Sequence, residues 1–98
     1  MFLARLNTKM HAKAVRSLEL LRRFGYELPM PHARKLKGYP LSEIRVKQGS
    51  DIVRLFYFAH RDAVYVVTSG YVKKSDKTNK LEIERALTIR SAFLQEDE

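Results

Sequence analysis

Cysteine is absent from the chain, and this excludes a disulfide framework and any metal site built on thiolates. The chain also lacks an uninterrupted run of about 18 apolar residues, the length that a membrane-spanning helix needs. The first residues, Met1 to Leu6, are too few to hold the apolar core of a signal peptide. These absences predict a protein that works in the cytoplasm.

Residues typical of several kinds of catalytic centre are also few. The histidines, His11, His32 and His60, have no cluster of carboxylates beside them, so we expect surface residues rather than metal ligands. Neither a glycine-rich phosphate loop nor a Gly-x-Ser-x-Gly motif occurs, and no two acids stand out as a glycosidase pair. We therefore expect neither a metal nor a cofactor.

Acidic residues are scarce in the first half of the chain. Residues 1–48 hold eleven Lys or Arg against three acids, whereas residues 49–98 hold eight residues of each sign. One side of the molecule should therefore be strongly positive, which suits a nucleic acid or an acidic partner protein, and equally serves solubility. Hydrophobic residues make up 45% of the 98 residues, enough for one core, so we expect a single domain over residues 1–98.

Two segments have helical patterns. The first runs from Thr8 to Phe24, with Thr8 or Asn7 as its cap and Gly25 as its stop. The second begins at Asn79, where Glu82 would complete a capping box. The residues expected to face the core are Met10, Ala14, Leu18 and Leu21 in the first helix, and Leu81, Ala86, Leu87, Ile89, Phe93 and Leu94 in the second.

Between the first helix and the strands, residues 26–40 contain three prolines, which argue against a long helix and a central strand. We interpret this segment as an irregular connection over the core, pinned by Leu28 and Leu36. Basic residues of this connection and of a second face of the first helix are either solvated or touch RNA or the ribosome. The candidate RNA- or ribosome-binding residues are Lys9, Lys13, Arg16, Arg23, Arg34, Lys35 and Lys37.

Three strands are predicted, over Leu41–Lys47, Ile52–Ala59 and Ala63–Ser69. The short segments between them, residues 48–51 and 60–62, read as hairpin turns, so the strands should form an antiparallel meander. The predicted fold class is α+β: an N-terminal helical region packed on a small antiparallel sheet of three strands or more, closed by a C-terminal helix.

The stretch Val64–Thr78 combines a strand with a basic segment. Its first half is β-branched and aromatic, which predicts a strand buried on both faces. Its second half is expected to leave the strand through Gly70 and to present Tyr71, Lys73, Lys74 and Lys77 beside the sheet. Such a set would hold an anionic backbone such as RNA, unless it is a solvated basic turn.

Arg54 is a charge in the middle of an apolar strand, where burial without a partner is costly. One interpretation is an arginine whose head reaches past its neighbours to solvent, so that Arg54→Leu keeps activity and even stabilises the strand. The other is a guanidinium held rigidly on the sheet to bind phosphate, so that Arg54→Leu is folded and inactive. The pattern leaves both open.

The polar residues on and beside these strands are sufficient for RNA cleavage. Attack by the 2′-hydroxyl of RNA needs a base, a cation on the crowded phosphate, and an acid for the leaving 5′-oxygen. Clustered cations change the pKa of lysine or tyrosine enough for either to act as acid or base. The candidate catalytic residues are Arg45, Arg54, Tyr57, Tyr71, Lys73, Lys74 and Lys77.

Two motifs in this set are characteristic: Glu-Ile-Arg at 43–45, and Gly-Tyr-Val-Lys-Lys at 70–74 followed by Lys77-Thr78. With Arg54-Leu-Phe-Tyr-Phe at 54–58 they resemble the phage-derived branch of the RelE/HigB-like toxins, over roughly residues 9–95. That resemblance implies a toxin of a type II toxin–antitoxin pair with a small α+β fold. It implies a metal-independent endonuclease that cleaves mRNA on the ribosome, with a helix-turn-helix antitoxin as partner. It also assigns to the family's basic site the residues Arg45, Arg54, Lys73, Lys74 and Lys77, with Tyr57 or Tyr71 as the acid–base residue.

Two departures from that family matter. Its members usually have a further strand and turn before the first helix, and its absence would leave a sheet edge for a partner, a homodimer or a rearranged N-terminus to cover. Asn79 also replaces a common proline, a mild change because Asn caps well. Two alternatives to mRNA cleavage stay open: a toxin of the same fold that inhibits DNA gyrase, and a catalytically inactive module that binds nucleic acid or antitoxin.

Overall fold

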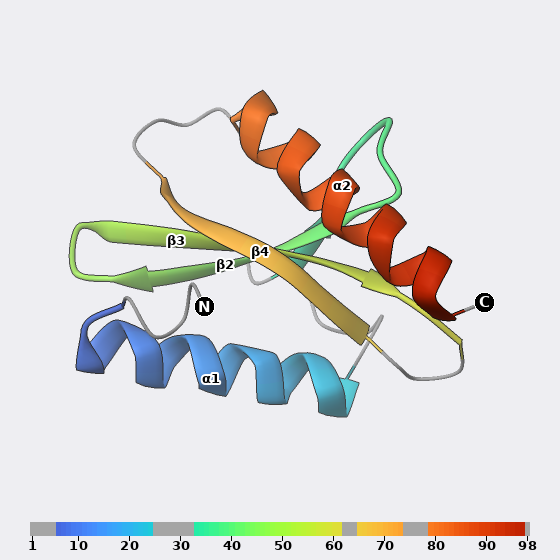
Figure 1. Ribbon diagram of the computed structural model, residues 1–98. Helices are drawn as coiled ribbons and strands as arrows, with labels where there is room; N and C mark the ends of the chain where they lie inside the picture. The colour runs from blue at the N-terminus through green and yellow to red at the C-terminus, as the bar shows by residue number, and fades with distance from the viewer. Residues whose placement is uncertain (1–5, 25–32, 62–64, 74–78, 98) are drawn as a thin grey trace.

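The computed structural model describes residues 6–24, 33–61, 65–73 and 79–97. The elements follow in the order α1 (Thr8–Phe24), β1 (Ala33–Lys35), β2 (Ser42–Gln48), β3 (Asp51–Ala59), β4 (Tyr65–Lys73) and α2 (Lys80–Asp97). The strands form one antiparallel sheet, with a helix before it and a helix after it (Figure 1). The predicted α+β class is confirmed.

The strands lie in sequence order, β1-β2-β3-β4, so the predicted meander is confirmed. A two-residue turn at Gly49 and Ser50 joins β2 to β3, and Gly49 has a φ of 62°, which a residue without a Cβ adopts at little cost. The turn makes Gln48 and Asp51 the first pair of residues, and the following pairs of β2 and β3 are set by their distance along the chain from it. Ile44 lies opposite Leu55, and Arg45 lies opposite Arg54.

One strand of the sheet comes from the proline-containing connection. The interpretation of residues 26–40 as irregular is wrong for Ala33–Lys35, which pairs with Ser42–Ile44 as β1. An edge strand has only one hydrogen-bonded side, so prolines close by are tolerated there, and three residues are too few to show an alternating pattern. Leu36 is buried, as expected, whereas Leu28 lies outside the described residues.

Alternation along the strands divides the core into two parts, one on each face of the sheet. On one face, residues of β2 and β3 such as Ile44 and Leu55 pack with α1. On the other face, Phe56 and Phe58 of β3 pack with Ile83 and other residues of α2. The two helices therefore cover opposite faces, and a residue's position in the alternation decides which helix it meets.

Helix α1 has the predicted bounds, and Asn7 rather than Thr8 is its cap. The Asn7 Oδ1 atom accepts a hydrogen bond of 2.9 Å from the Met10 backbone N–H. Met10, Ala14 and Leu21 are buried, and Leu18 packs against them, which confirms the predicted apolar stripe. Gly25 lies outside the described residues.

Helix α2 is capped by Asn79, whose Oδ1 accepts a bond of 2.9 Å from the Leu81 N–H. The capping box is wrong in one respect: the Asn79 backbone N–H bonds to the Tyr71 hydroxyl at 3.3 Å, and Glu82 pairs with Arg85 instead. The predicted core positions also need correction. Leu81 and Ile89 are exposed, and the buried residues of this helix are Ile83 and Ala86.

Strand β4 differs from the prediction in length and in burial. It continues through Gly70, which pairs with Leu55, and ends at Lys73. It is also an edge strand, and Val67 and Val72 are exposed, so the expectation of a strand buried on both faces is wrong. Its composition suits a central strand, but among the described residues only β3 pairs with it. Tyr71 consequently belongs to the sheet and not to a loop beside it.

Candidate functional site

A row of three polar side chains crosses the sheet from β2 to β4. Arg54 of β3 is paired directly with Arg45 of β2 on one side and with Tyr71 of β4 on the other. Residues that are directly opposite in an antiparallel sheet point to the same face. The face is the one that α2 covers further along the strands, because Phe56 follows Arg54 at a spacing of two. Arg45 and Arg54 therefore share this face of the sheet.

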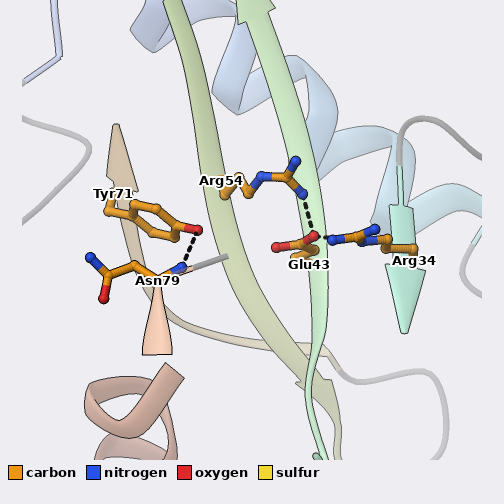
Figure 2. A network of polar contacts seen from close by, with 5 residues as sticks. All are labelled: Arg34, Glu43, Arg54, Tyr71 and Asn79. Carbon is orange, nitrogen blue, oxygen red and sulfur yellow. Dashed lines mark hydrogen bonds and ion pairs between the residues drawn. The ribbon is translucent and has the colours of Figure 1, made fainter. Parts of the chain in front are cut away.

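Arg54 is held in place by a carboxylate that the sequence analysis did not assign to the site. Glu43 of β2 is only 1% exposed, and its Oε1 atom accepts a hydrogen bond from Arg54 Nη1. The same oxygen accepts a bond of 2.7 Å from Nε of Arg34 on β1. Figure 2 shows the two guanidinium groups reaching this carboxylate from two sides. Three neighbouring strands therefore each contribute one residue to a single ion network.

This network contradicts the first interpretation of Arg54 and adds a fixed partner to the second. The residue is 8% exposed, so its head does not reach past its neighbours into solvent. Its Nη1 is also already bound to Glu43, so it is not a fully vacant phosphate clamp. A buried charge is stable only when it is paired, and Glu43 supplies that pairing. Two guanidinium groups share one carboxylate, which leaves the network with an excess positive charge, and Arg45 next to Arg54 adds to it.

Several polar atoms on this face have no hydrogen-bond partner among the described residues. They are Glu43 Oε2, Arg45 Nε, Arg54 Nε and Ser69 Oγ. Ser69 is paired with Phe56, so it shares the face of the others. Buried polar groups in native proteins are nearly always bonded, and an exception calls for an explanation. Either ordered water or a bound polar group would satisfy these atoms.

Tyr71 provides a phenol at a fixed position beside Arg54. Its ring is stacked on Phe56 with centroids 5.7 Å apart and an interplanar angle of 24°. Its hydroxyl oxygen accepts the 3.3 Å bond from the Asn79 N–H (Figure 2), so the hydroxyl proton is left for a second bond. The ring of Tyr71 is therefore held by Phe56 and its hydroxyl by Asn79 at the start of α2.

Tyr57, the other predicted phenol, is not part of this row. It lies on the α1 face of the sheet, where it is 8% exposed and belongs to the core beneath α1. Its ring packs edge-on against Tyr65 with centroids 6.1 Å apart. Because side chains alternate along β3, Tyr57 points away from Arg54 and Phe56. Tyr57 is therefore separated by the sheet from Arg45, Arg54 and Tyr71, the predicted residues that the row brings together.

The predicted lysines are only partly placed. The backbone of Lys73 pairs with Ile52 at the end of β4, one pair beyond Val53↔Val72. Lys74 and Lys77 lie outside the described residues.

The predicted RNA- or ribosome-binding residues do not form one surface. Arg34 belongs to the Glu43 network, and Lys35 and Lys37 are exposed near β1. The basic residues of α1 are exposed on the helix that covers the sheet face away from Arg34. Two of them, Lys13 and Arg16, line a pocket between α1 and β2 together with Arg45. Lys9 and Arg23 do not line it.

A signal for Glu43 was present in the sequence. A two-residue turn at Gly49 and Ser50 fixes the pairing of β2 with β3, and that pairing puts Arg45 directly opposite Arg54. Like charges directly opposite each other are destabilising. A compensating acid two residues along on the same face was therefore to be expected, and Glu43 is the acid in that position.

These residues define a small α+β protein with a polar, cation-rich sheet face. The chain matches the family described as phage derived protein Gp49-like (DUF891) over residues 1–91, and it belongs to that family. The family is associated with the toxins of toxin–antitoxin systems. No curated protein and no solved structure matches the chain significantly. No helix in the described part of the chain is long and apolar enough to cross a membrane.

Proposed function

We propose that the protein is the toxin of a type II toxin–antitoxin pair and cleaves mRNA on the ribosome in the cytoplasm. The family association supports the toxin assignment. The observation that carries the chemistry is the row of Arg45, Arg54 and Tyr71, in which the central guanidinium is fixed by a buried carboxylate. A cation fixed before the substrate arrives stabilises developing charge without reorganising during the reaction.

In the proposed reaction, the 2′-oxygen of one nucleotide attacks the adjacent phosphorus and the bond to the 5′-oxygen breaks. The products are a 2′,3′-cyclic phosphate and a 5′-hydroxyl. Arg54 and Arg45 stabilise the charge on the non-bridging oxygens, since guanidinium donors match phosphate geometry. Tyr71 donates its free hydroxyl proton to the leaving 5′-oxygen. The base that takes the 2′-proton is one of the lysines of the 73–77 segment.

Glu43 has a positioning role in this proposal. Its carboxylate holds Arg54 from β3 and Arg34 from β1, so the guanidinium groups keep a fixed direction on the sheet.

A helix-turn-helix antitoxin is the proposed neutralising partner. Two chemical features favour cleavage over the gyrase alternative. The phenol of Tyr71 lies on the same sheet face as the guanidinium groups of Arg45 and Arg54, and the Nε donors of these two arginines suit a phosphate.

The test uses Arg54→Lys, which keeps the charge beside Glu43 but loses the planar two-pronged donor. Expression of the parental protein without antitoxin is expected to stop protein synthesis first, measured by labelled amino-acid and thymidine incorporation. Primer extension on ribosome-bound message should then show new 5′ ends. Arg54→Lys should fold normally and reduce these ends about tenfold, since one directed donor is lost. If DNA synthesis stops first and no new ends form, the gyrase alternative is correct.

A further inference from the structure

A pocket of about 460 Å³ lies between α1 and β2, near the place where β1 no longer covers β2. The seven residues that line it are Lys13, Arg16, Ser17, Leu20, Arg45, Val46 and Lys47. Its volume is in the range of about 300–1,000 Å³ that is typical of small-ligand sites. It therefore has room for a nucleotide-sized group, and Arg45 is the one lining residue that the proposed cleavage reaction uses.

The charge of this pocket is of one sign. Four of its lining residues are Lys or Arg, and none is an acid. In the described part of the chain, no carboxylate pairs with Arg16, Arg45 or Lys47. Cations that converge on a concave surface repel one another, and concave walls concentrate their field. A bound anion would relieve that repulsion.

One of the cations is fixed by the sheet. The Lys13 Nζ atom donates a bond of 2.9 Å to the backbone carbonyl of Lys47, which ties α1 to the end of β2. An ammonium group has three donors, so Lys13 keeps donors for a ligand. The pocket thus contains a cation whose position does not depend on the ligand.

Arg45 connects this pocket with the row on the sheet. It lies directly opposite Arg54, and it is also one of the residues that line the pocket. An anion that contacts both the pocket and the row must pass along the edge of β2 and carry negative charge at more than one position. A phosphodiester chain has this property, because it carries one charge per nucleotide.

We propose that the pocket between α1 and β2 is a second phosphate-binding subsite for the RNA strand whose scissile phosphate lies at Arg54. This inference rests on the proposed function for its choice of RNA. The pocket holds a phosphodiester that neighbours the cleaved one, and it sets the direction of the strand across β2. Apart from Arg45, which also belongs to the row on the sheet, its residues contribute to RNA affinity and do not take part in the bond-breaking step.

The experiment compares two double variants with the same loss of charge. The pocket variant carries Arg16→Ser and Lys47→Ser, and the control carries Arg22→Ser and Arg85→Ser. All four side chains are exposed, so neither variant should lose its fold, and melting by circular dichroism verifies this. The probe is a fluorescein-labelled 2′-O-methyl oligouridylate of about 12 nucleotides. It lacks the attacking hydroxyl, so anisotropy reports binding without cleavage.

We expect the pocket variant to bind this probe about tenfold more weakly than the control at low salt. The plot of log affinity against log salt should also become shallower by about 1.4, because two contacts to a single strand are lost. Equal affinities and equal slopes for the two variants would overturn the inference.

The outcomes separate this inference from the proposed function. If the pocket variant loses affinity and the parental protein cleaves no message, the subsite stands and the nuclease assignment fails. If the parental protein cleaves message and both variants bind the probe alike, the nuclease stands and the subsite is wrong. If only binding of a poly-glutamate peptide is weakened in the pocket variant, the pocket serves an acidic protein segment and the RNA assignment is wrong.

Discussion

Arg54 and Arg16 show two different settings for the same side chain in one small protein. Arg54 is buried in the sheet and held by Glu43, whereas Arg16 is exposed on α1 and has no acid beside it in the pocket it lines. A buried guanidinium needs its partner to fold, so changing it alters both stability and chemistry. An exposed guanidinium is solvated in either state, so changing it should alter binding and its salt dependence but not folding.

The largest expected effect is on the free energy of unfolding when the buried Arg54 is changed. Arg54→Leu leaves the Glu43 carboxylate buried with only Arg34, and removing one partner of a buried pair costs about 3–5 kcal/mol of unfolding free energy. Urea unfolding measures this loss.

The matched variant for this prediction is the double change Glu43→Leu with Arg54→Leu. It removes both buried charges, so most of the lost stability should return, because apolar residues can replace a buried pair with little loss. If the double variant is as unstable as Arg54→Leu alone, the two residues do not form an energetically coupled pair.

The second effect concerns the two phenols on opposite faces of the sheet. Tyr71→Phe keeps the ring on Phe56 but removes the proton donor, so cleavage should fall roughly a hundredfold with the fold intact. Tyr57→Phe should leave the cleavage rate of the folded protein unchanged, because its hydroxyl is on the α1 face. Single-turnover cleavage of ribosome-bound message compares them. A larger loss of rate in Tyr57→Phe would show that the chemistry is on the other face.

The smallest effect is expected at an exposed ion pair. Arg22 lies 3.2 Å from Glu19 on α1, and both side chains are largely exposed. Arg22→Ala should change the free energy of unfolding by only about 0–0.5 kcal/mol, since water solvates both charges and salt screens them. Thermal unfolding at low and high salt checks this. A loss comparable with that of Arg54→Leu would mean that exposure does not separate the two classes of arginine.

Much of the fold was predictable because its signals are local. The bounds of α1, the cap at Asn79 and the hairpin at Gly49 each depend on residues close together in the chain. β1 was missed because a three-residue strand has too little alternation to be recognised. The burial of β4 was overestimated because its composition does not reveal how many strands lie beside it.

The site was predictable only in part. The sequence singled out Arg45, Arg54 and Tyr71, and the structure brings these three into one row. It also singled out Tyr57, because residue type alone does not say which face of the sheet a tyrosine occupies. Glu43 was overlooked because an acid in an alternating strand looks like a solvent-facing residue until the strand pairing places it beneath two arginines.

The turn at Gly49 and Ser50 determines which residues of β2 face α1 and which face away from it, because it sets the pairing of β2 with β3. If one residue is inserted there and the pairing shifts by one, every side chain of β2 exchanges faces relative to β3. Glu43 would enter the core beneath α1, and Ile44 would replace it beside Arg54. Changes in this hairpin that shift the pairing of β2 with β3 should therefore be tolerated when the shift is two residues and rejected when it is one. The pairing that this hairpin sets is therefore as much a requirement of the polar sheet face as the side chains themselves are.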